Sequence, residues 1–132
     1  MADTKKIVLI EDDRASSRLM AAFLEKKGYR VLESHEARFG IELTLKEKPD
    51  LLIADILLPD MKGSDAVKEL KMSAMGKDLK VLFLTSLLNK KAGPETLTKL
   101  TVEGLQYPAL AKPFKPEKLI EVIDNLIGEG KN

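Results

Sequence analysis

Short apolar runs alternate with segments of helical periodicity along this chain, and this alternation restricts the possible folds most strongly. Because the runs are apolar almost throughout, they are typical of strands that are buried on both faces of a sheet. We expect strands at residues 6–10, 29–34, 50–55, 80–85 and 108–111, and helices at residues 14–27, 37–48, 64–75, 94–103 and 116–127. The pattern predicts a doubly wound α/β domain with a five-stranded parallel sheet and helices on both faces.

Length and composition limit the class of protein. The 132 residues suffice for one domain with a real core, so residues 1–132 are expected to form a single domain that ends in a flexible tail at 128–132. The chain has no cysteine, which excludes disulfides and cysteine-based zinc sites, and its net charge of +1 gives no reason to expect nucleic acid as a partner. We find neither a signal peptide nor an apolar run that could span a membrane, so we expect a cytoplasmic protein.

Polar residues stand at the carboxyl ends of four predicted strands. In open α/β sheets ligands bind at this edge, where the order of the strands reverses. If the first and third strands are neighbours, their acidic ends converge. The residues concerned are Glu11, Asp12 and Asp13 after the first strand, Asp55 after the third, Thr85 and Ser86 after the fourth, and Lys112 after the fifth.

Converging carboxylates need a cation. Two carboxylates about 4 to 6 Å apart repel each other by roughly 4 kcal/mol at an effective dielectric constant near 20. Mg²⁺ favours a few carboxylate oxygens together with water, and Lys112 would neutralise further charge. A hydroxyl from Thr85 and the ammonium of Lys112 beside a metal-bound carboxylate could bind phosphoryl oxygens while Asp55 attacks the phosphorus.

Each of these signals also has a structural explanation. The acidic cluster could cap the helix that begins at Arg14, for which Asp13 alone is a good N-cap. Asp55 could be a turn residue before Pro59. The functional interpretation gains weight because the residues fall at the ends of different strands on one edge of the sheet, with complementary charges.

The segments "IVLIEDD", "LLIADILLPDMKG", "VLFLTS" and "AKPF" together resemble the receiver domain of two-component response regulators, over essentially the whole chain. The resemblance implies a flavodoxin-like sheet of order 2-1-3-4-5, and a protein that assists its own phosphorylation and dephosphorylation but is otherwise no enzyme. We expect a monomer or weak dimer, and from its net charge a chain that binds neither nucleic acid nor membranes directly. The phosphoryl donor would be the phosphohistidine of a histidine kinase or phosphotransfer protein.

The resemblance also assigns roles to individual residues. Asp55 would be the phosphoacceptor, and Thr85 and Lys112 would contact the phosphoryl group. The Mg²⁺ ligands would be Glu11, Asp12, Asp55 and the backbone carbonyl of Leu57. Asp13 lies one position past the acidic pair, so we expect it to cap the helix. A cis peptide bond is expected between Lys112 and Pro113.

The chain departs from the family pattern near its last strand. Receiver domains usually carry an aromatic residue three positions before the lysine, and Ala109 stands there. Tyr107 lies two residues earlier, and the connection from Thr85 to Lys112 is several residues longer than usual. We therefore expect phosphorylation to be retained while the aromatic switch is altered or absent.

Two other functions remain open. A receiver-like module with a decayed switch could stay bound to a partner constantly, which Ala109 favours and the full set of acidic, Thr and Lys residues disfavours. A phosphatase on a similar scaffold would need a second aspartate two residues after the nucleophile, where this chain has Leu57. The first strand is not followed by a glycine-rich loop, which argues against nucleotide enzymes.

Overall fold

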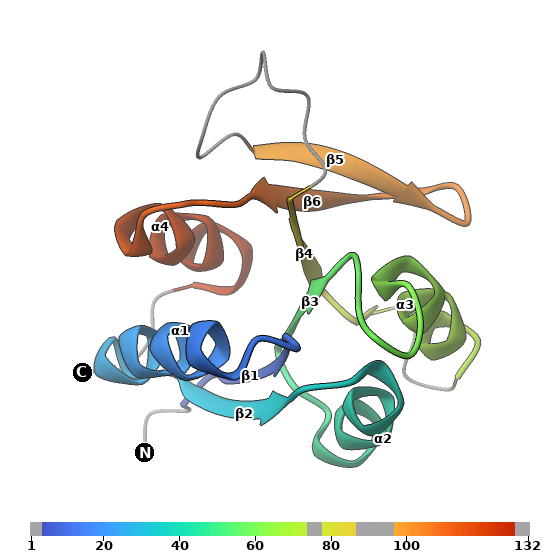
Figure 1. The fold of residues 1–132 in the computed structure, drawn as a ribbon, viewed down its shortest axis with the longest axis horizontal. Coiled ribbons are helices and arrows are strands. Elements are labelled where there is room, and N and C mark those ends of the chain that lie inside the picture. Colours follow the sequence, from blue (N-terminus) through green and yellow to red (C-terminus); the bar gives the residue numbers. More distant parts are fainter. Residues whose placement is uncertain (1–3, 74–77, 87–96, 129–132) are drawn as a thin grey trace.

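A computed structural model of the chain describes residues 4–73, 78–86 and 97–128. One sheet runs through this part of the molecule in the order β2-β1-β3-β4-β6-β5. Its strands are β1 (Lys6–Ile10), β2 (Arg30–Ser34), β3 (Leu51–Asp55), β4 (Val81–Thr85), β5 (Leu97–Val102) and β6 (Leu105–Ala111). The helices are α1 (Arg14–Lys26), α2 (Ala37–Glu47), α3 (Gly63–Lys71) and α4 (Pro116–Ile127). Figure 1 shows α1 and α4 on one face of the sheet and α2 and α3 on the other.

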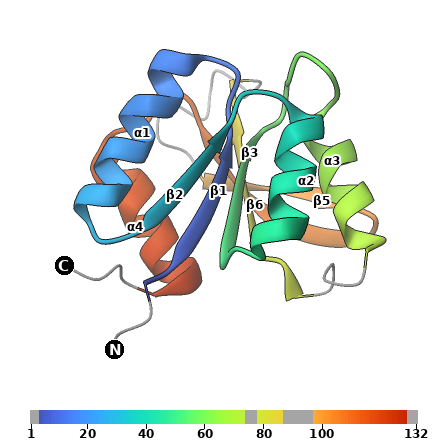
Figure 2. The ribbon, with the colours of Figure 1, turned by 90° about the horizontal axis from the view of Figure 1, so that it is seen from below.

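The two faces of the sheet bury separate apolar cores. Side chains alternate along β1, so that Ile7 and Leu9 pack with α1 and α4 while Val8 and Ile10 pack with α2 and α3. Strands β3 and β4 are buried at every position. A fully buried Leu or Ile contributes roughly 1.5 to 3 kcal/mol. Figure 2 shows the central strands enclosed between the two helix layers, which explains their continuous apolar sequences.

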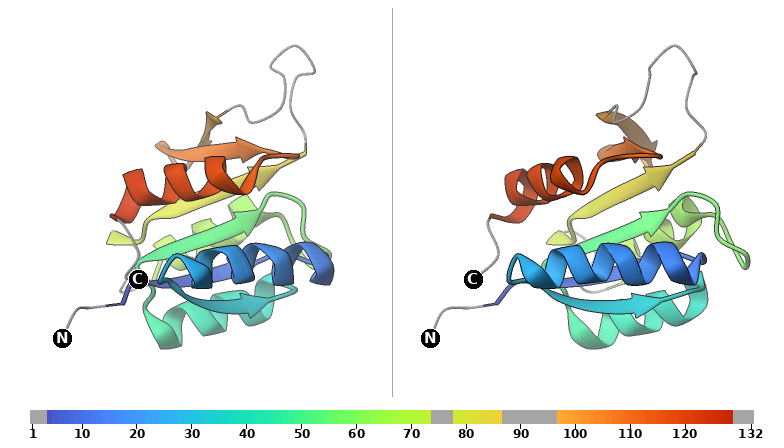
Figure 3. Two further views of the ribbon diagram at one scale, coloured as in Figure 1. Left: turned by 90° about the vertical axis from the view of Figure 1, so that its left-hand side faces the viewer. Right: turned by 60° about the vertical axis from the view of Figure 1, so that its left-hand side comes forward.

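The doubly wound fold and the order of the parallel strands are confirmed. β1 pairs in parallel with β2 and β3, β3 with β4, and β4 with β6, which is the predicted fifth strand extended toward its N-terminus. Figure 3 shows these strands running side by side in one direction. The sheet has six strands instead of five because β5 is added at its edge.

The predicted helix at residues 94–103 is wrong where the structure describes it. Residues 97–102 form β5, which pairs antiparallel with β6, and residues 94–96 lie outside the described residues. Thr98, Thr101 and Val102 are β-branched, and such side chains favour strands over helices. A short helix with little apolar surface therefore competed poorly with pairing to β6.

A two-residue turn connects β5 to β6. Glu103 and Gly104 both have positive φ angles, 51° and 79°, as tight hairpin turns require. Pro108 is tolerated in β6 because pairing with β4 begins only at Ala109, so its missing N–H leaves no gap in that ladder. A solvent-exposed ion pair between Lys68 and Glu103 at 3.2 Å also connects the hairpin to α3.

Tyr107 and Ala109 lie in β6 on the face that carries α2 and α3. The ring of Tyr107 is buried, packs edge-on against Phe83 with 6.0 Å between centroids, and has the ammonium of Lys71 5.3 Å from its centre. Ala109 is buried as well. The aromatic side chain of this strand is thus part of the core and lies two residues from the position usual in the family.

Two predicted segments lie partly outside the described residues. The helix predicted at 64–75 appears as α3, which ends at Lys71, and residues 74 and 75 are not described. Of the tail predicted at 128–132, only Gly128 is described. None of the helices in the described ranges combines the length and the apolar character needed to cross a bilayer.

Candidate functional site

Three carboxylates meet at the carboxyl edge of the sheet. Glu11 and Asp12 follow β1, and Asp55 ends β3, which is the parallel neighbour of β1. One oxygen from each carboxylate can be chosen so that all three lie within 4.8 Å of one another. Glu11 and Asp55 are buried, whereas Asp12 is exposed. The predicted convergence of the acidic residues is therefore confirmed.

Lys112 links the two buried carboxylates. Its ammonium lies 2.5 Å from Glu11 Oε1 and also donates a hydrogen bond to Asp55 Oδ2. The backbone N–H of Lys112 donates to the carbonyl of Thr85 at 2.8 Å, which fixes the lysine beside the end of β4. The peptide bond between Lys112 and Pro113 is cis, as expected.

The charges of the cluster do not balance. Three carboxylates and one ammonium leave a net charge of −2 among Glu11, Asp12, Asp55 and Lys112. Two carboxylates separated by about 5 Å repel each other by roughly 3 kcal/mol at an effective dielectric constant near 20. A hard divalent cation with oxygen ligands would cancel this charge, so the residues fit Mg²⁺.

Burial and ion pairing shift the pKa values of two of these groups. Burial raises the pKa of Glu11, although hydrogen bonds from Lys112 and from the N–H of Asp13 oppose the shift. Burial acts to lower the pKa of Lys112, but its hydrogen bonds to Asp55 and Glu11 outweigh this effect and raise the pKa. Lys112 is thus held as a cation at the centre of the cluster.

The remaining predicted residues lie around this cluster. Thr85 is buried at the end of β4. It directly follows Leu84, which pairs with Asp55 on β3. Leu57 donates its N–H to Asp55 Oδ1 at 3.0 Å, and the role of its carbonyl stays a prediction.

Asp13 accepts hydrogen bonds from the N–H groups of Ala15 and Ser16 at 3.0 and 3.2 Å, which confirms that it caps α1.

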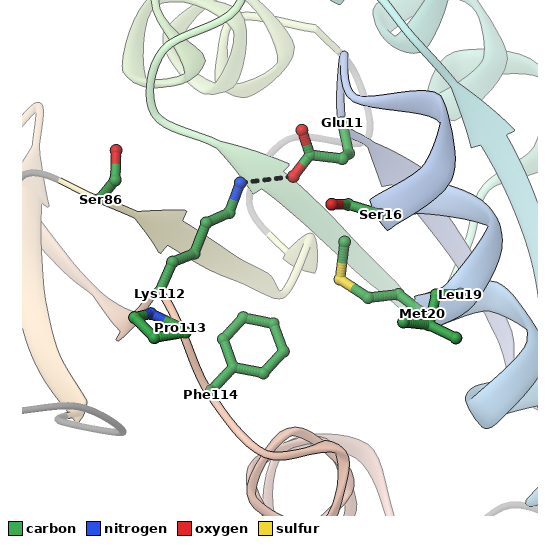
Figure 4. Close-up of a pocket in the computed structure, with 8 residues that line it drawn as sticks. All are labelled: Glu11, Ser16, Leu19, Met20, Ser86, Lys112, Pro113 and Phe114. Carbon is green, nitrogen blue, oxygen red and sulfur yellow. Dashed lines mark hydrogen bonds and ion pairs between the residues drawn. The ribbon is translucent and has the colours of Figure 1, made fainter.

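An open cavity of about 460 Å³ adjoins the cluster. Figure 4 shows Lys112 and Glu11 pointing toward each other at its polar side, with Met20 and Phe114 on its apolar side. The cavity lies between α1 and the segment that leads from β6 to α4. Lys112 and Glu11 line it, so the cavity borders the buried part of the cluster.

Asp60 is a residue of this region that the sequence did not reveal. It lies in the loop between Asp55 and α3, and its carboxylate accepts hydrogen bonds from the N–H groups of Ala37 and Arg38 at 2.7 and 2.8 Å. The residue before α2, Glu36, makes no capping hydrogen bond with its own side chain. Asp60 therefore caps α2 from a distant part of the chain and holds the loop after Asp55 against that helix.

We expect the Asp60→Ala variant to lower the free energy of unfolding at pH 7 by about 1 kcal/mol, the usual value of an N-cap. Burial acts to raise the pKa of Asp60, but the N–H groups of Ala37 and Arg38 lower it overall. The stabilisation is therefore complete above the ordinary value of 3.8 and is lost as the pH falls through the lowered pKa. Urea unfolding from neutral to acidic pH measures this difference.

The Asp60→Asn variant is an intermediate case, because its single amide oxygen can accept only one of the two N–H groups that the two carboxylate oxygens of Asp60 accept. Its stability at pH 7 should lie between those of the wild type and the Asp60→Ala variant, and because asparagine does not titrate, it should not show the acid-dependent loss. Equal stability of the wild type and the Asp60→Ala variant at pH 7 would contradict the capping role.

The family model for the response regulator receiver domain matches residues 7–124. A probable transcriptional regulator, ycf29, from Porphyra purpurea is 30% identical over 92% of this chain and 56% of its own length. The response regulator SaeR from Staphylococcus aureus (strain USA300) is 28% identical over 92% of this chain and 50% of its own length. The chain thus spans about half the length of these curated relatives.

Solved structures agree with this match. The chemotaxis protein CheY4 of Vibrio cholerae superposes with a TM-score of 0.79 at 25% identity, covering 94% of this chain and 99% of that chain. A CheY-like response regulator receiver domain protein from Methanospirillum hungatei JF-1 gives a TM-score of 0.73 at 25% identity, covering 93% of each chain. With its acidic cluster and lysine at the expected sheet edge, the chain belongs to the response regulator receiver domain family of two-component systems.

Proposed function

We propose that this receiver domain accepts a phosphoryl group on Asp55 in a reaction that depends on Mg²⁺. The observation that carries the proposal is the cluster of Glu11, Asp12 and Asp55 with Lys112 bound to two of its members. The donor is the phosphohistidine of a sensor kinase or phosphotransfer protein in the cytoplasm. The product is a changed surface for a downstream protein.

In the proposed reaction an oxygen of Asp55 forms a bond to phosphorus while the bond from phosphorus to the donor's imidazole nitrogen breaks. The electron pair of that bond stays on the nitrogen, which then takes up a proton from solvent. Lys112 already contacts Asp55 Oδ2 and moves its contact to a phosphoryl oxygen. The hydroxyl of Thr85 binds another phosphoryl oxygen. These interactions compensate the negative charge that Asp55 gains.

The Mg²⁺ ligands in this proposal are Glu11, Asp12, Asp55 and the carbonyl of Leu57. Bound Mg²⁺ would neutralise charge on the carboxylates and on the incoming phosphoryl oxygens. The N–H of Leu57 donates a hydrogen bond to Asp55 Oδ1 and so orients the carboxylate of Asp55, whose second oxygen, Oδ2, faces Lys112. The protein thus supplies mainly orientation and charge, which dominate phosphoryl transfer in general.

The test is incubation of the purified chain with a small phosphodonor such as phosphoramidate, followed by intact-mass measurement. We expect a gain of one phosphoryl group in the presence of Mg²⁺ and little or none when EDTA replaces the metal. If no phosphoryl group is gained in Mg²⁺ over a range of donors, the proposal is wrong. A constantly bound interaction module would then be the better explanation.

A further inference from the structure

Strand β5 forms the outer edge of the sheet, at a place where the sequence predicted a helix. Among the residues that the structure describes, β5 pairs with β6 alone. Four of its six residues are exposed, and Leu97 has 46% of its surface accessible. Figures 1 and 3 show β5 at the end of the sheet, with β6 on its inner side. An edge strand of this kind offers backbone donors and acceptors to an added strand.

The register identifies which backbone groups of β5 face outward. Lys112 N–H donates to Thr85 on β4, so even-numbered positions of β6 direct their polar groups to β4 and odd-numbered ones direct theirs to β5. The partners of the odd-numbered positions 105, 107 and 109 are residues 102, 100 and 98, which therefore face β6. Leu97, Lys99 and Thr101 direct their N–H and C=O groups away from the sheet.

We propose that β5 is the interface of a homodimer, in which β5 strands of two copies pair antiparallel across a two-fold axis at Leu100. The two sheets then form one continuous sheet. The outward groups of Lys99 meet those of Thr101 in the second copy, and Leu100 faces its own equivalent. Leu100 is partly buried against the core that contains Tyr107. In the dimer, Leu100 of the second copy would pack against Leu100 of the first and enlarge this apolar surface.

The bounds and the side chains of β5 favour this register over its two neighbours. An axis at Thr101 would overlap only residues 100–102 of the two strands, whereas an axis at Leu100 overlaps residues 98–102. Centring the axis on Lys99 places two ammonium groups directly opposite each other, which destabilises a strand pair. Centring the axis on Leu100 places Lys99 opposite a threonine and Thr98 opposite Val102, with no pair of like charges. A second copy is the occupant that β5 favours, because in this register the strand opposes Leu100 to Leu100 and brings no like charges together.

Cysteine cross-linking tests both the interface and its register, since the chain has no natural cysteine. The Leu100→Cys variant of the 132-residue chain is treated with a mild oxidant and compared with the Thr98→Cys variant. Both positions lie on the same strand and side, but only position 100 faces its own equivalent. We expect at least about tenfold more disulfide-linked dimer from Leu100→Cys. Position 98 pairs with position 102 of the second copy, so the two cysteines at position 98 would lie four residues apart along the strands, too far to form a disulfide.

Light scattering of the wild-type chain over a range of concentrations tests the dimer without any substitution. We expect the average mass to rise toward that of two copies. The Thr101→Pro variant removes an outward N–H and should remain monomeric with an unchanged circular dichroism spectrum. A wild-type chain that stays monomeric at every concentration, or equal cross-linking of the two cysteine variants, would overturn the proposal.

Discussion

The Asp55→Asn variant should gain no phosphoryl group under conditions in which the wild type gains one. The amide of asparagine carries no negative charge and is a poor nucleophile, so the bond to phosphorus does not form. The substitution keeps the shape of the side chain and its contact with the N–H of Leu57, so the fold should persist. Intact-mass measurement and a thermal unfolding curve separate these two results.

The same variant should respond more weakly to Mg²⁺. Removing one carboxylate reduces the net charge of the cluster from −2 to −1, so Mg²⁺ should raise the melting temperature less than in the wild type. Asp65→Asn is the matched control, because Asp65 is exposed on α3 and lies outside the cluster. It should gain phosphate and respond to Mg²⁺ as the wild type does. A full phosphoryl gain by Asp55→Asn would exclude Asp55 as the acceptor.

The parallel core of the fold could be predicted because its strands are buried on both faces. "LLIAD" and "VLFLT" can hardly occupy any other place in a soluble domain of this size. The β5–β6 hairpin could not be predicted as securely. Leu97 and Leu100 stand three residues apart, which also fits one face of a helix. Only the Glu103–Gly104 pair between two apolar residues, together with the threonines, indicated a hairpin.

The acidic cluster could be predicted because strand ends in a parallel sheet converge by topology. The sequence order alone brings Glu11, Asp55 and Lys112 to one edge once the strands are placed. The cap that Asp60 provides depends instead on the path of a loop relative to α2, and no local pattern encodes that path. Such tertiary capping explains why Glu36 can precede a helix without capping it.

Gly63 connects the position of Asp55 to the start of α3. Its N–H donates to the carbonyl of Ile56 at 2.7 Å, so the first residue of α3 packs against the backbone that follows β3. A Cβ atom at this position would lie 2.2 Å from the carbonyl oxygen of Asp55 and 3.1 Å from its carbonyl carbon. Backbone atoms cannot rotate away as side chains do, so either α3 or the end of β3 would have to move.

We expect the Gly63→Ala variant to lower the free energy of unfolding by about 3 kcal/mol, the upper end of the usual cost of overpacking. It should also slow phosphoryl gain, because the displaced backbone carries the carboxylate of Asp55 with it. Urea unfolding and intact-mass time courses measure the two effects. Ser64→Ala is the control, since it introduces the same residue one position later, and its stability should stay within about 0.5 kcal/mol of the wild type. Wild-type stability in Gly63→Ala would show that α3 can shift freely against Asp55.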